Sequence, residues 1–358
     1  MRKSLFLSGL LALVLILTAC GTLPTGEPST DTLGAQSTPS VQEVFLEGPS
    51  PFVSTSGEMT NETPAFWIVE FSGPPTVRGG SPAVLRNQRA AFRSAAAAEA
   101  IGFQERFNFE RLFNGLSVAA TPAAAGKLGR LPGVVAIWPV EAIPIPEPSP
   151  SLEPDLLTAL AMTGADSAQS ELDLSGRGIR VAVIDTGIDY NHPDLGGRWG
   201  NRVVAGWDFV GDSFNAIDPA NSIPSPDPSP MDCNGHGTHV AGIVGASGAV
   251  TGVAPEVTFG AYKVFGCVGS TFSDLIIVAM ERALVDGMHI VNMSLGAAFQ
   301  WPQFPTAVAA SNLVRAGVVV VASIGNSGAN GVFSAGAPGV GADAVSYTHL
   351  TLPTNREV

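Results

Sequence analysis

Apolar residues open the chain as a single block and then become sparse. Leu5 to Leu17 is apolar except for Ser8 and Gly9, and it follows the cationic Met1-Arg2-Lys3. A block this short behind positive charges is typical of a secretory signal peptide rather than a membrane span. Residues 21–63 are rich in Ser, Thr, Pro and Gly and bury too little apolar surface to order themselves, so they are predicted to be a disordered tether.

A first folded unit is predicted over residues 64–143. Aromatic and β-branched runs indicate strands, and an Ala-rich stretch and a Pro at a first turn indicate helices. The predicted elements are strand 66–71, helix 81–104, helix 121–131 and strand 134–138. An Asn-Gly turn signal lies between the helices, at Asn114. This order predicts a small α+β, ferredoxin-like domain.

After a Pro-rich segment, the linker 144–165, the pattern becomes that of an α/β domain over 166–346. Apolar strands predicted near 178–185 and 318–323 alternate with helical spacing over 271–287, which indicates a parallel sheet flanked by helices. The strand near 178 ends at Asp185 and a glycine turn. Ligands gather at the carboxyl ends of parallel strands, so Asp185 lies where function is expected.

Composition narrows the function classes. Hydrophobic residues make up 45% of the 358 residues and charged residues 14%, which is enough apolar material for a sizeable core. The net charge of −13 argues against nucleic acid or an anionic membrane surface as the main partner, because both require a basic footprint.

A glycine turn, Asn234-Gly235, opens into a small-residue helix that carries His236 and His239. The two imidazoles could share a face and bind a metal, but a His pair three residues apart without a carboxylate is a weak metal signal. The other reading is nucleophilic catalysis. A serine hydroxyl needs an imidazole to remove its proton, and that imidazole needs a carboxylate to fix its tautomer.

The segments Val183–Asp189 and His236–Gly242 resemble, in wording and order, the subtilisin-like serine proteases of peptidase family S8. The resemblance implies a secreted serine endopeptidase that hydrolyses polypeptides by an Asp-His-Ser mechanism. Asp185 would orient the imidazole and His236 would be the general base. The alternative is a buried structural Asp and a core His.

Two later segments extend the resemblance. His289 to Gly296 is similar to the family strand that pairs with substrate, which implies that Ser294, Leu295 and Gly296 bind peptide. Asn326, in a Gly-Asn-x-Gly turn after the strand near 318, matches the oxyanion-hole asparagine. By itself, Asn326 could equally be an ordinary turn residue.

The unit 64–143 resembles the inhibitory propeptide of subtilisin precursors. The resemblance rests on Trp67-Ile68-Val69, Phe113-Asn114-Gly115 and Leu131–Val134. It implies an intramolecular inhibitor and chaperone that is released by a cut within 142–165. The alternative is a small α+β module of another role.

The three cysteines receive two assignments. Leu17-Thr18-Ala19-Cys20 resembles the lipobox of bacterial lipoprotein precursors, which implies lipidation of Cys20, a membrane anchor and an exported, cell-surface or released product. An ordinary signal peptide is the alternative. Cys233 and Cys267 resemble the bridged pair of aqualysin-like subtilisins, with two free thiols as the alternative.

No cofactor or catalytic metal is required by such a mechanism. Asp189, Asp194 and Asp208 leave a structural calcium ion possible, because carboxylates are its usual ligands.

The sequence departs from the family after Ser346. No Gly-Thr-Ser occurs in it, and residues 347–358 do not resemble the family, so we expect a C-terminally truncated precursor with a non-native tail that lacks the serine and is inactive. A non-catalytic, surface-tethered pseudoprotease or peptide-binding lipoprotein is the alternative. An α/β-hydrolase would need a Gly-x-Ser-x-Gly elbow, which is absent from the sequence.

Overall fold

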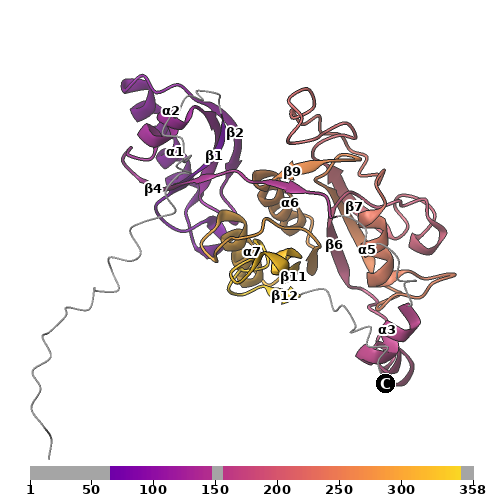
Figure 1. The fold of residues 1–358 in the computed structure, drawn as a ribbon. Coiled ribbons are helices and arrows are strands. Elements are labelled where there is room, and N and C mark those ends of the chain that lie inside the picture. Colours follow the sequence, from indigo (N-terminus) through magenta and orange to yellow (C-terminus); the bar gives the residue numbers. More distant parts are fainter. Residues whose placement is uncertain (1–64, 147–155, 348–358) are drawn as a thin grey trace, which may run out of the picture. The chain divides into compact units, whose positions relative to one another are not determined.

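The computed structural model describes residues 65–146 and 156–347 (Figure 1). The predicted signal peptide with Cys20, the tether and most of the predicted tail lie outside the described residues. Within the described ranges, no helix combines the length and apolarity needed to cross a membrane.

The N-terminal domain is a four-stranded antiparallel sheet with two helices. Its elements are β1 (Ala65–Phe71), η1 (Thr76–Arg78), α1 (Pro82–Ala98), β2 (Gln104–Phe109), β3 (Gly115–Ala120), α2 (Pro122–Leu128) and β4 (Val134–Pro139). The strands lie in the order β2-β3-β1-β4, which together with the two crossover helices is the ferredoxin-like topology. Thr121 begins α2 by accepting a hydrogen bond from the amide of Ala124 at 3.2 Å.

Side chains of β1 alternate between two cores, because successive strand residues point to opposite faces. Val69 and Phe71 pack with Phe92 of α1 in the core of the N-terminal domain. Phe66 and Ile68 face the other way, into the large core that also contains residues of the α/β domain. The sheet is therefore buried on both faces.

The Asn-Gly signal does not make a two-residue hairpin turn. Gly115 already belongs to β3, and Asn114 is buried and donates from Nδ2 to the carbonyl oxygen of Ser72 at 3.0 Å. A Cβ at Gly115 would lie 2.4 Å from the carbonyl oxygen of Val69, so glycine permits a close strand approach there. The first helix also ends at Ala98, earlier than predicted, because β2 begins at Gln104.

The second domain is the predicted α/β domain. Its strands are β6 (Arg180–Asp185), β7 (Val203–Asp208), β8 (Thr258–Lys263), β9 (Ser270–Phe272), β10 (Ile290–Met293), β11 (Val319–Ser323) and β12 (Val345–Tyr347). Its helices are α5 (His236–Gly245), α6 (Ser273–Val285) and α7 (Pro305–Arg315), with η2 (Pro193–Leu195) and η3 (Ser327–Asn330). Six strands form a parallel sheet in the order β12-β11-β10-β6-β8-β7.

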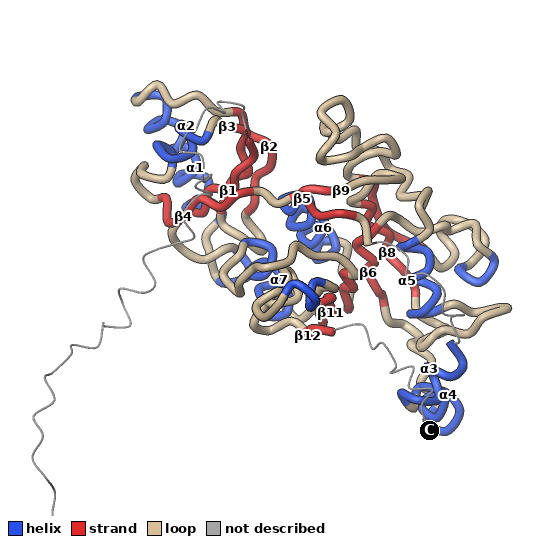
Figure 2. The backbone as a smooth tube through the Cα atoms, in the orientation of Figure 1, coloured by secondary structure: helices blue, strands red, loops and turns tan. Residues whose placement is uncertain are grey.

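Helices cover both faces of this sheet (Figure 2). Along β6, Ala182 and Ile184 pack in the core shared with α6 and α7, whereas Val181 and Val183 pack in the core shared with α5. A strand that is apolar on both sides is what a doubly covered parallel sheet requires. The predicted fold class, a parallel sheet flanked by helices, is confirmed.

The segment predicted as a linker contains regular structure at both ends. Strand β5 (Ala142–Pro144) pairs antiparallel with β9. Helix α3 (Leu156–Thr163) is followed by α4 (Ala165–Leu172). Tyr347, at the start of the predicted tail, ends β12 and pairs with Ser323 of β11.

Candidate active site

Asp185 and His236 meet at the carboxyl end of β6. Asp185 is the last residue of that strand and is fully buried, and His236 is the first residue of α5. Nδ1 of His236 lies 2.7 Å from Oδ1 of Asp185, and the same oxygen accepts the amide N–H of Thr186 at 2.7 Å. The carboxylate thus faces the inner ring nitrogen, which leaves the other nitrogen available as a base.

The surroundings of His236 change its affinity for a proton. Burial lowers the pKa of the imidazole. The hydrogen bond and charge of Asp185, together with the charge of Asp232, raise it by more than burial lowers it, so the pKa lies above its ordinary value. The pair therefore favours an imidazolium, which is the state that forms when the base has accepted a proton.

Asp232, which the sequence analysis did not single out, holds the turn that precedes His236. Its Oδ1 accepts the amides of Asn234 and Gly235, each at 2.9 Å. Its Oδ2 accepts the amide and the hydroxyl of Thr238 in the first turn of α5, at 2.9 and 2.6 Å. An Asp that precedes a Gly-rich turn at a helix start is a capping signal, and that signal could have identified it.

Two glycines allow α5 to approach β6 closely. A Cβ at Gly237 would lie 2.2 Å from the carbonyl oxygen of Gly187, and Gly187 itself has a φ of +107°. Any side chain at residue 237 would push the helix start away from the turn after β6. The glycines of both motifs are therefore part of what brings His236 to Asp185.

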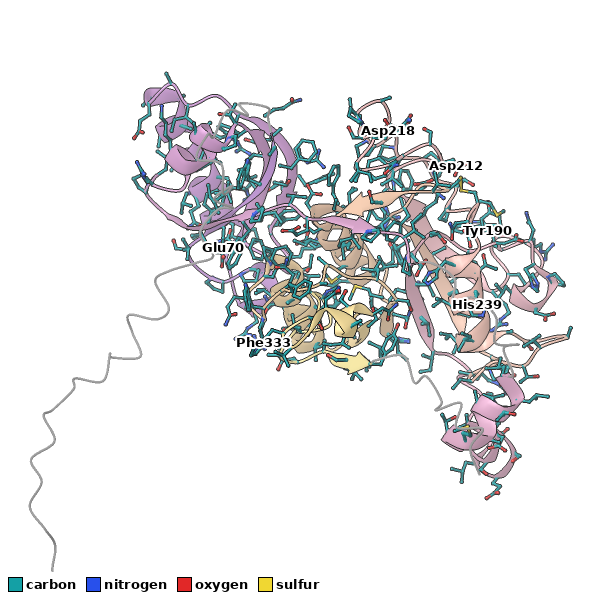
Figure 3. The ribbon with its side chains drawn as sticks, viewed as in Figure 1. Glu70, Tyr190, Asp212, Asp218, His239 and Phe333 are labelled. Carbon is teal, nitrogen blue, oxygen red and sulfur yellow. A yellow bond between two sulfur atoms is a disulfide. The ribbon has the colours of Figure 1, made fainter. Side chains whose placement is uncertain are left out.

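Lys263 is a second residue that the sequence analysis missed. It ends β8, is fully buried, and its Nζ donates to the carbonyl oxygen of Thr186 at 3.2 Å. Its ammonium also lies 3.4 Å from Oδ1 of Asp212, which is labelled in Figure 3. Sγ of Cys233 and Sγ of Cys267 lie at bonding distance, 1.98 Å, and tie the turn before α5 to the loop after β8.

The predicted peptide-binding residues follow β10, the strand beside β6. Leu295 is buried, Ser294 and Gly296 are half-buried, and Oγ of Ser294 lies 2.6 Å from the hydroxyl of Tyr347. Asn326 follows β11 and is exposed. Asp185 ends β6, and the other residues follow β10 and β11, so all of them lie at the carboxyl ends of three adjacent strands.

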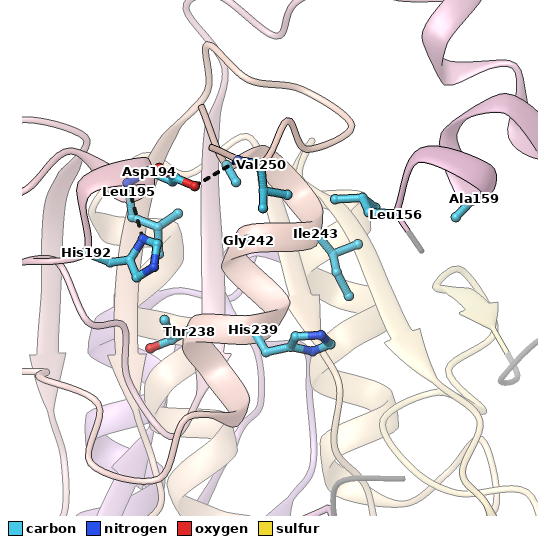
Figure 4. Close-up of a pocket in the computed structure, with 11 residues that line it drawn as sticks. Leu156, Ala159, His192, Asp194, Leu195, Thr238, His239, Gly242, Ile243 and Val250 are labelled. Carbon is cyan, nitrogen blue, oxygen red and sulfur yellow. Dashed lines mark hydrogen bonds between the residues drawn. The ribbon is translucent and has the colours of Figure 1, made fainter. Parts of the chain in front are cut away.

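Two further expectations from the sequence concern His239 as a metal ligand and the missing serine. His239 is exposed and lines a pocket beside α5 (Figure 4). His236, by contrast, is hydrogen-bonded to Asp185. Within residues 65–146 and 156–347, no serine hydroxyl hydrogen-bonds to the His236 ring.

Sequence comparison relates this region to known proteins. A family model described as the subtilase family matches residues 176–351. The minor extracellular protease Vpr of Bacillus subtilis (strain 168) is 36% identical over 255 residues, which are 69% of this chain and 30% of that protein. Subtilisin Savinase of Lederbergia lenta is 40% identical over 162 residues, which are 44% of this chain and 52% of that protein.

Structural comparison agrees on the fold. The epidermin leader peptide processing serine protease of Staphylococcus aureus superposes with a TM-score of 0.54 at 21% identity, covering 74% of this chain and 61% of that one. The matched region covers 30% of protease Vpr and 52% of subtilisin Savinase, so the chain spans about half or less of the length of these two relatives. The sequence motifs, the family match and this fold agree, and residues 176–351 are a domain of the subtilase family.

Proposed function

We propose that this chain is part of a serine endopeptidase of the subtilisin type. The observation that carries the proposal is the 2.7 Å hydrogen bond between His236 and Asp185 at the carboxyl end of β6. In this mechanism His236 takes the serine proton, and the alkoxide attacks the peptide carbonyl carbon. The imidazolium then protonates the leaving amine, and water hydrolyses the acyl-enzyme.

The remaining site residues have roles that follow from their places beside the pair. The amide of Asn326 would donate to the oxyanion that forms on the attacked carbonyl oxygen. The main chain of Ser294 to Gly296 would pair with an extended peptide. Asp185 holds the tautomer, while Asp232 and Lys263 act through the turns that they fix and are positioning residues.

The serine nucleophile, in this proposal, is contributed by residues outside the printed sequence. Support comes from the absence of Gly-Thr-Ser in the 358 residues. The source DNA beyond the Ser346 codon tests it. An in-frame Gly-Thr-Ser is the expected result, and a stop codon in an intact natural gene would contradict it and favour the surface-tethered pseudoprotease. If that stop codon is found, residues 347–358 are part of the natural protein.

The N-terminal domain is proposed to be the intramolecular inhibitor. Oε1 of Glu281, on α6, accepts the amides of Arg111 and Leu112 at 2.8 and 2.9 Å. Oδ2 of the buried Asp274, also on α6, accepts Nε–H of Arg106 at 3.0 Å and the hydroxyl of Ser117 at 2.6 Å. Carboxylates of the α/β domain thus satisfy donors of the N-terminal domain. Domains that only share a linker would lack such paired contacts.

Export is supported by the relatives and by the apolar block near the N-terminus. One relative is named an extracellular protease. Lipidation at Cys20 would anchor the protein at the cell surface, and an oxidising compartment would maintain the bond between Cys233 and Cys267.

We further propose that Asp194 does not need a calcium ion. Its Oδ1 accepts the amide of Ala249 at 3.0 Å. Its Oδ2 accepts the amide of Val250, also at 3.0 Å (Figure 4). These hydrogen bonds lower the pKa of Asp194. Oδ1 of Asp208 similarly accepts the amides of Val210 and Gly211. Backbone N–H groups thus surround these carboxylates. Their hydrogen bonds stabilise the negative charge, as a bound cation would.

A chelator is therefore expected to leave the melting temperature of the chain unchanged near neutral pH, as measured by calorimetry with and without EDTA. Lowering the pH, by contrast, should lower the melting temperature. Because the folded pKa of Asp194 is lowered, its contribution to stability is present above the ordinary aspartate pKa of about 3.9 and is lost as pH falls below that value. A drop in melting temperature on chelation that added calcium reverses would contradict the proposal.

A further inference from the structure

Asparagine is followed by glycine at three places in the chain, Asn114, Asn234 and Asn330. In such a pair the amide nitrogen of the glycine can attack the side-chain carbonyl carbon of the asparagine, because glycine has no Cβ to hinder the approach. A succinimide ring forms as ammonia leaves, and water then opens the ring to aspartate or isoaspartate. The three pairs have different surroundings, so the fold decides which of them can react.

The second pair lies on the turn that leads into His236. Asn234 and Gly235 are both exposed. Gly235 has a φ of +106°, and in the described structure nothing beyond its chain neighbours lies within 4 Å of the position that a Cβ would take. Space therefore does not prevent the reaction at this pair, and what opposes it is hydrogen bonding.

Both reacting groups of this pair are held. The amide N–H of Gly235 donates to Oδ1 of Asp232 at 2.9 Å, and a carboxylate that binds this proton opposes its loss. Nδ2 of Asn234 donates to the carbonyl oxygen of Cys267 at 3.1 Å, and Oδ1 of Asn234 accepts the amide of His236 at 3.2 Å. The side chain must break both of these hydrogen bonds before its carbonyl carbon can turn towards the glycine nitrogen.

The disulfide is the covalent restraint on this turn. Cys233 and Asn234 are chain neighbours, so the bond from Cys233 to Cys267 keeps the Cys267 carbonyl oxygen within reach of the Asn234 amide. Residues 233, 234 and 235 are all exposed, so none of them anchors the turn with a buried side chain. Segments that are held by exposed hydrogen bonds alone open locally at a low cost in free energy.

The other two pairs show the extremes of protection. Asn330 is exposed at the end of η3, and its side chain has no hydrogen-bond partner among the described residues. The Gly331 amide alone is held there, by the carbonyl oxygen of Gly328 at 3.1 Å. Asn114 is buried, and its Nδ2 donates to the carbonyl oxygen of Ser72 at 3.0 Å. The first of these pairs is therefore expected to react readily and the second to be protected.

We propose that Asn234-Gly235 is a hydrolytic modification site in the turn before His236, that the bond between Cys233 and Cys267 protects it, and that it reacts once a dithiol reduces this bond. In the reduction, the dithiol becomes a disulfide and the two cysteines become thiols. The Gly235 nitrogen then bonds to Cγ of Asn234, the Cγ–Nδ2 bond breaks, and ammonia leaves with the amide proton. One water opens the ring to aspartate or to isoaspartate, whose main chain runs through the side chain.

Both products disturb His236. Aspartate replaces the amide that donates to Cys267 with a carboxylate, and it adds a negative charge two residues before the imidazole. Isoaspartate adds an atom to the main chain of the turn and so shifts the start of α5 relative to Asp185. The inference goes beyond the proposed function and needs no turnover. If the acid–base pair acts as proposed, activity lost in this way does not return when the disulfide forms again.

The site is tested by mass spectrometry of peptides from chain 21–358 that has been kept at mildly alkaline pH with or without dithiothreitol. In the oxidised chain, Asn234 should be modified at least about tenfold more slowly than Asn330. In the reduced chain, its rate should come within about threefold of that of Asn330, while Asn114 stays slow and shows that the N-terminal domain is still folded.

Three results would overturn the proposal. Equal rates at Asn234 and Asn330 in the oxidised chain would mean that the folded turn gives no protection. A rate at Asn234 that stays slow after both thiols are shown to be free would mean that the disulfide is not the restraint. Acceleration of Asn114 together with Asn234 would mean that the whole fold, rather than the disulfide, protects the site.

The effect on the acid–base pair is tested separately, by proton NMR of the His236 imidazole. Asn234→Asp has the side chain of the aspartate product and should raise the His236 pKa by more than Asn330→Asp, the matched control at another Asn-Gly pair. An equal or smaller shift would contradict the claim that the modification reaches His236. Neither measurement depends on hydrolysis of a peptide, so failure of the proposed function would be seen only in the activity of the longer, serine-containing product.

Discussion

A polypeptide of residues 21–358 is expected to hydrolyse casein no faster than buffer. His236 and Asp185 are in place to accept a proton, but the described residues put no serine hydroxyl on the imidazole, so no acyl-enzyme can form. Loss of the nucleophile from a subtilisin lowers kcat about 10⁶-fold. The expected deficit is of that size relative to a gene product that includes an in-frame Gly-Thr-Ser segment.

The measurement is release of acid-soluble peptides from casein by the two polypeptides at equal concentration. The longer product with alanine in place of the Gly-Thr-Ser serine is the matched control, and it should be as inactive as chain 21–358. Activity of chain 21–358 that a serine-directed sulfonyl fluoride abolishes would show that its nucleophile is already present.

Asp185→Asn is expected to lower the pKa of the His236 imidazole below its ordinary value. In the unsubstituted chain the hydrogen bond and charge of Asp185, with the smaller effect of the Asp232 charge, outweigh burial. After the substitution, burial, the largest single effect, is opposed by the charge of Asp232 alone. Because the folded pKa of His236 is raised, protonation of this imidazole stabilises the fold below the ordinary histidine pKa of about 6.5, and this contribution is lost as pH rises through the folded pKa. In a product that carries the serine, kcat should fall about 10⁴-fold.

Proton NMR of the imidazole in chain 21–358 measures this pKa without any need for turnover. Asp189→Asn is the matched control, since Asp189 lies on the same turn but accepts the amide of Asn191 rather than contacting His236. The control should leave the titration unchanged. A His236 pKa that is the same in Asp185→Asn and in the unsubstituted chain would mean that the carboxylate does not set the basicity of the ring.

Local sequence patterns were enough to predict the positions of Asp185 and His236 in the fold. An apolar strand that ends in Asp and Gly, and a glycine turn that opens a helix at His, predicted where Asp185 and His236 would lie. Asp232 and Lys263 were missed for different reasons. The role of Asp232 depends on five donors, four from the turn before α5 and its first residues and one from Thr186, whereas Lys263 reaches Thr186 because β8 lies beside β6.

Elements that depend on contacts between segments far apart in the sequence were also less predictable. Asn114-Gly115 indicated a hairpin turn, but the asparagine amide is used inside the domain and the glycine admits a neighbouring strand. The Pro-rich linker gave no sign of pairing, because each of its prolines weakens a strand prediction. Only the folded chain shows that Ile143 and Ile145 place those prolines off the hydrogen-bonding side of β5.

Labelling by a fluorophosphonate, which reacts only with an activated serine, tests the central claim most directly. That claim is that Asp185 and His236 are the acid–base pair of a subtilisin-type protease whose serine lies outside residues 1–358. We predict no label on chain 21–358, stoichiometric label on the Gly-Thr-Ser serine of the longer product, and loss of that label in its His236→Ala variant. Stoichiometric label on chain 21–358, or label on the longer product that survives His236→Ala, would contradict the account.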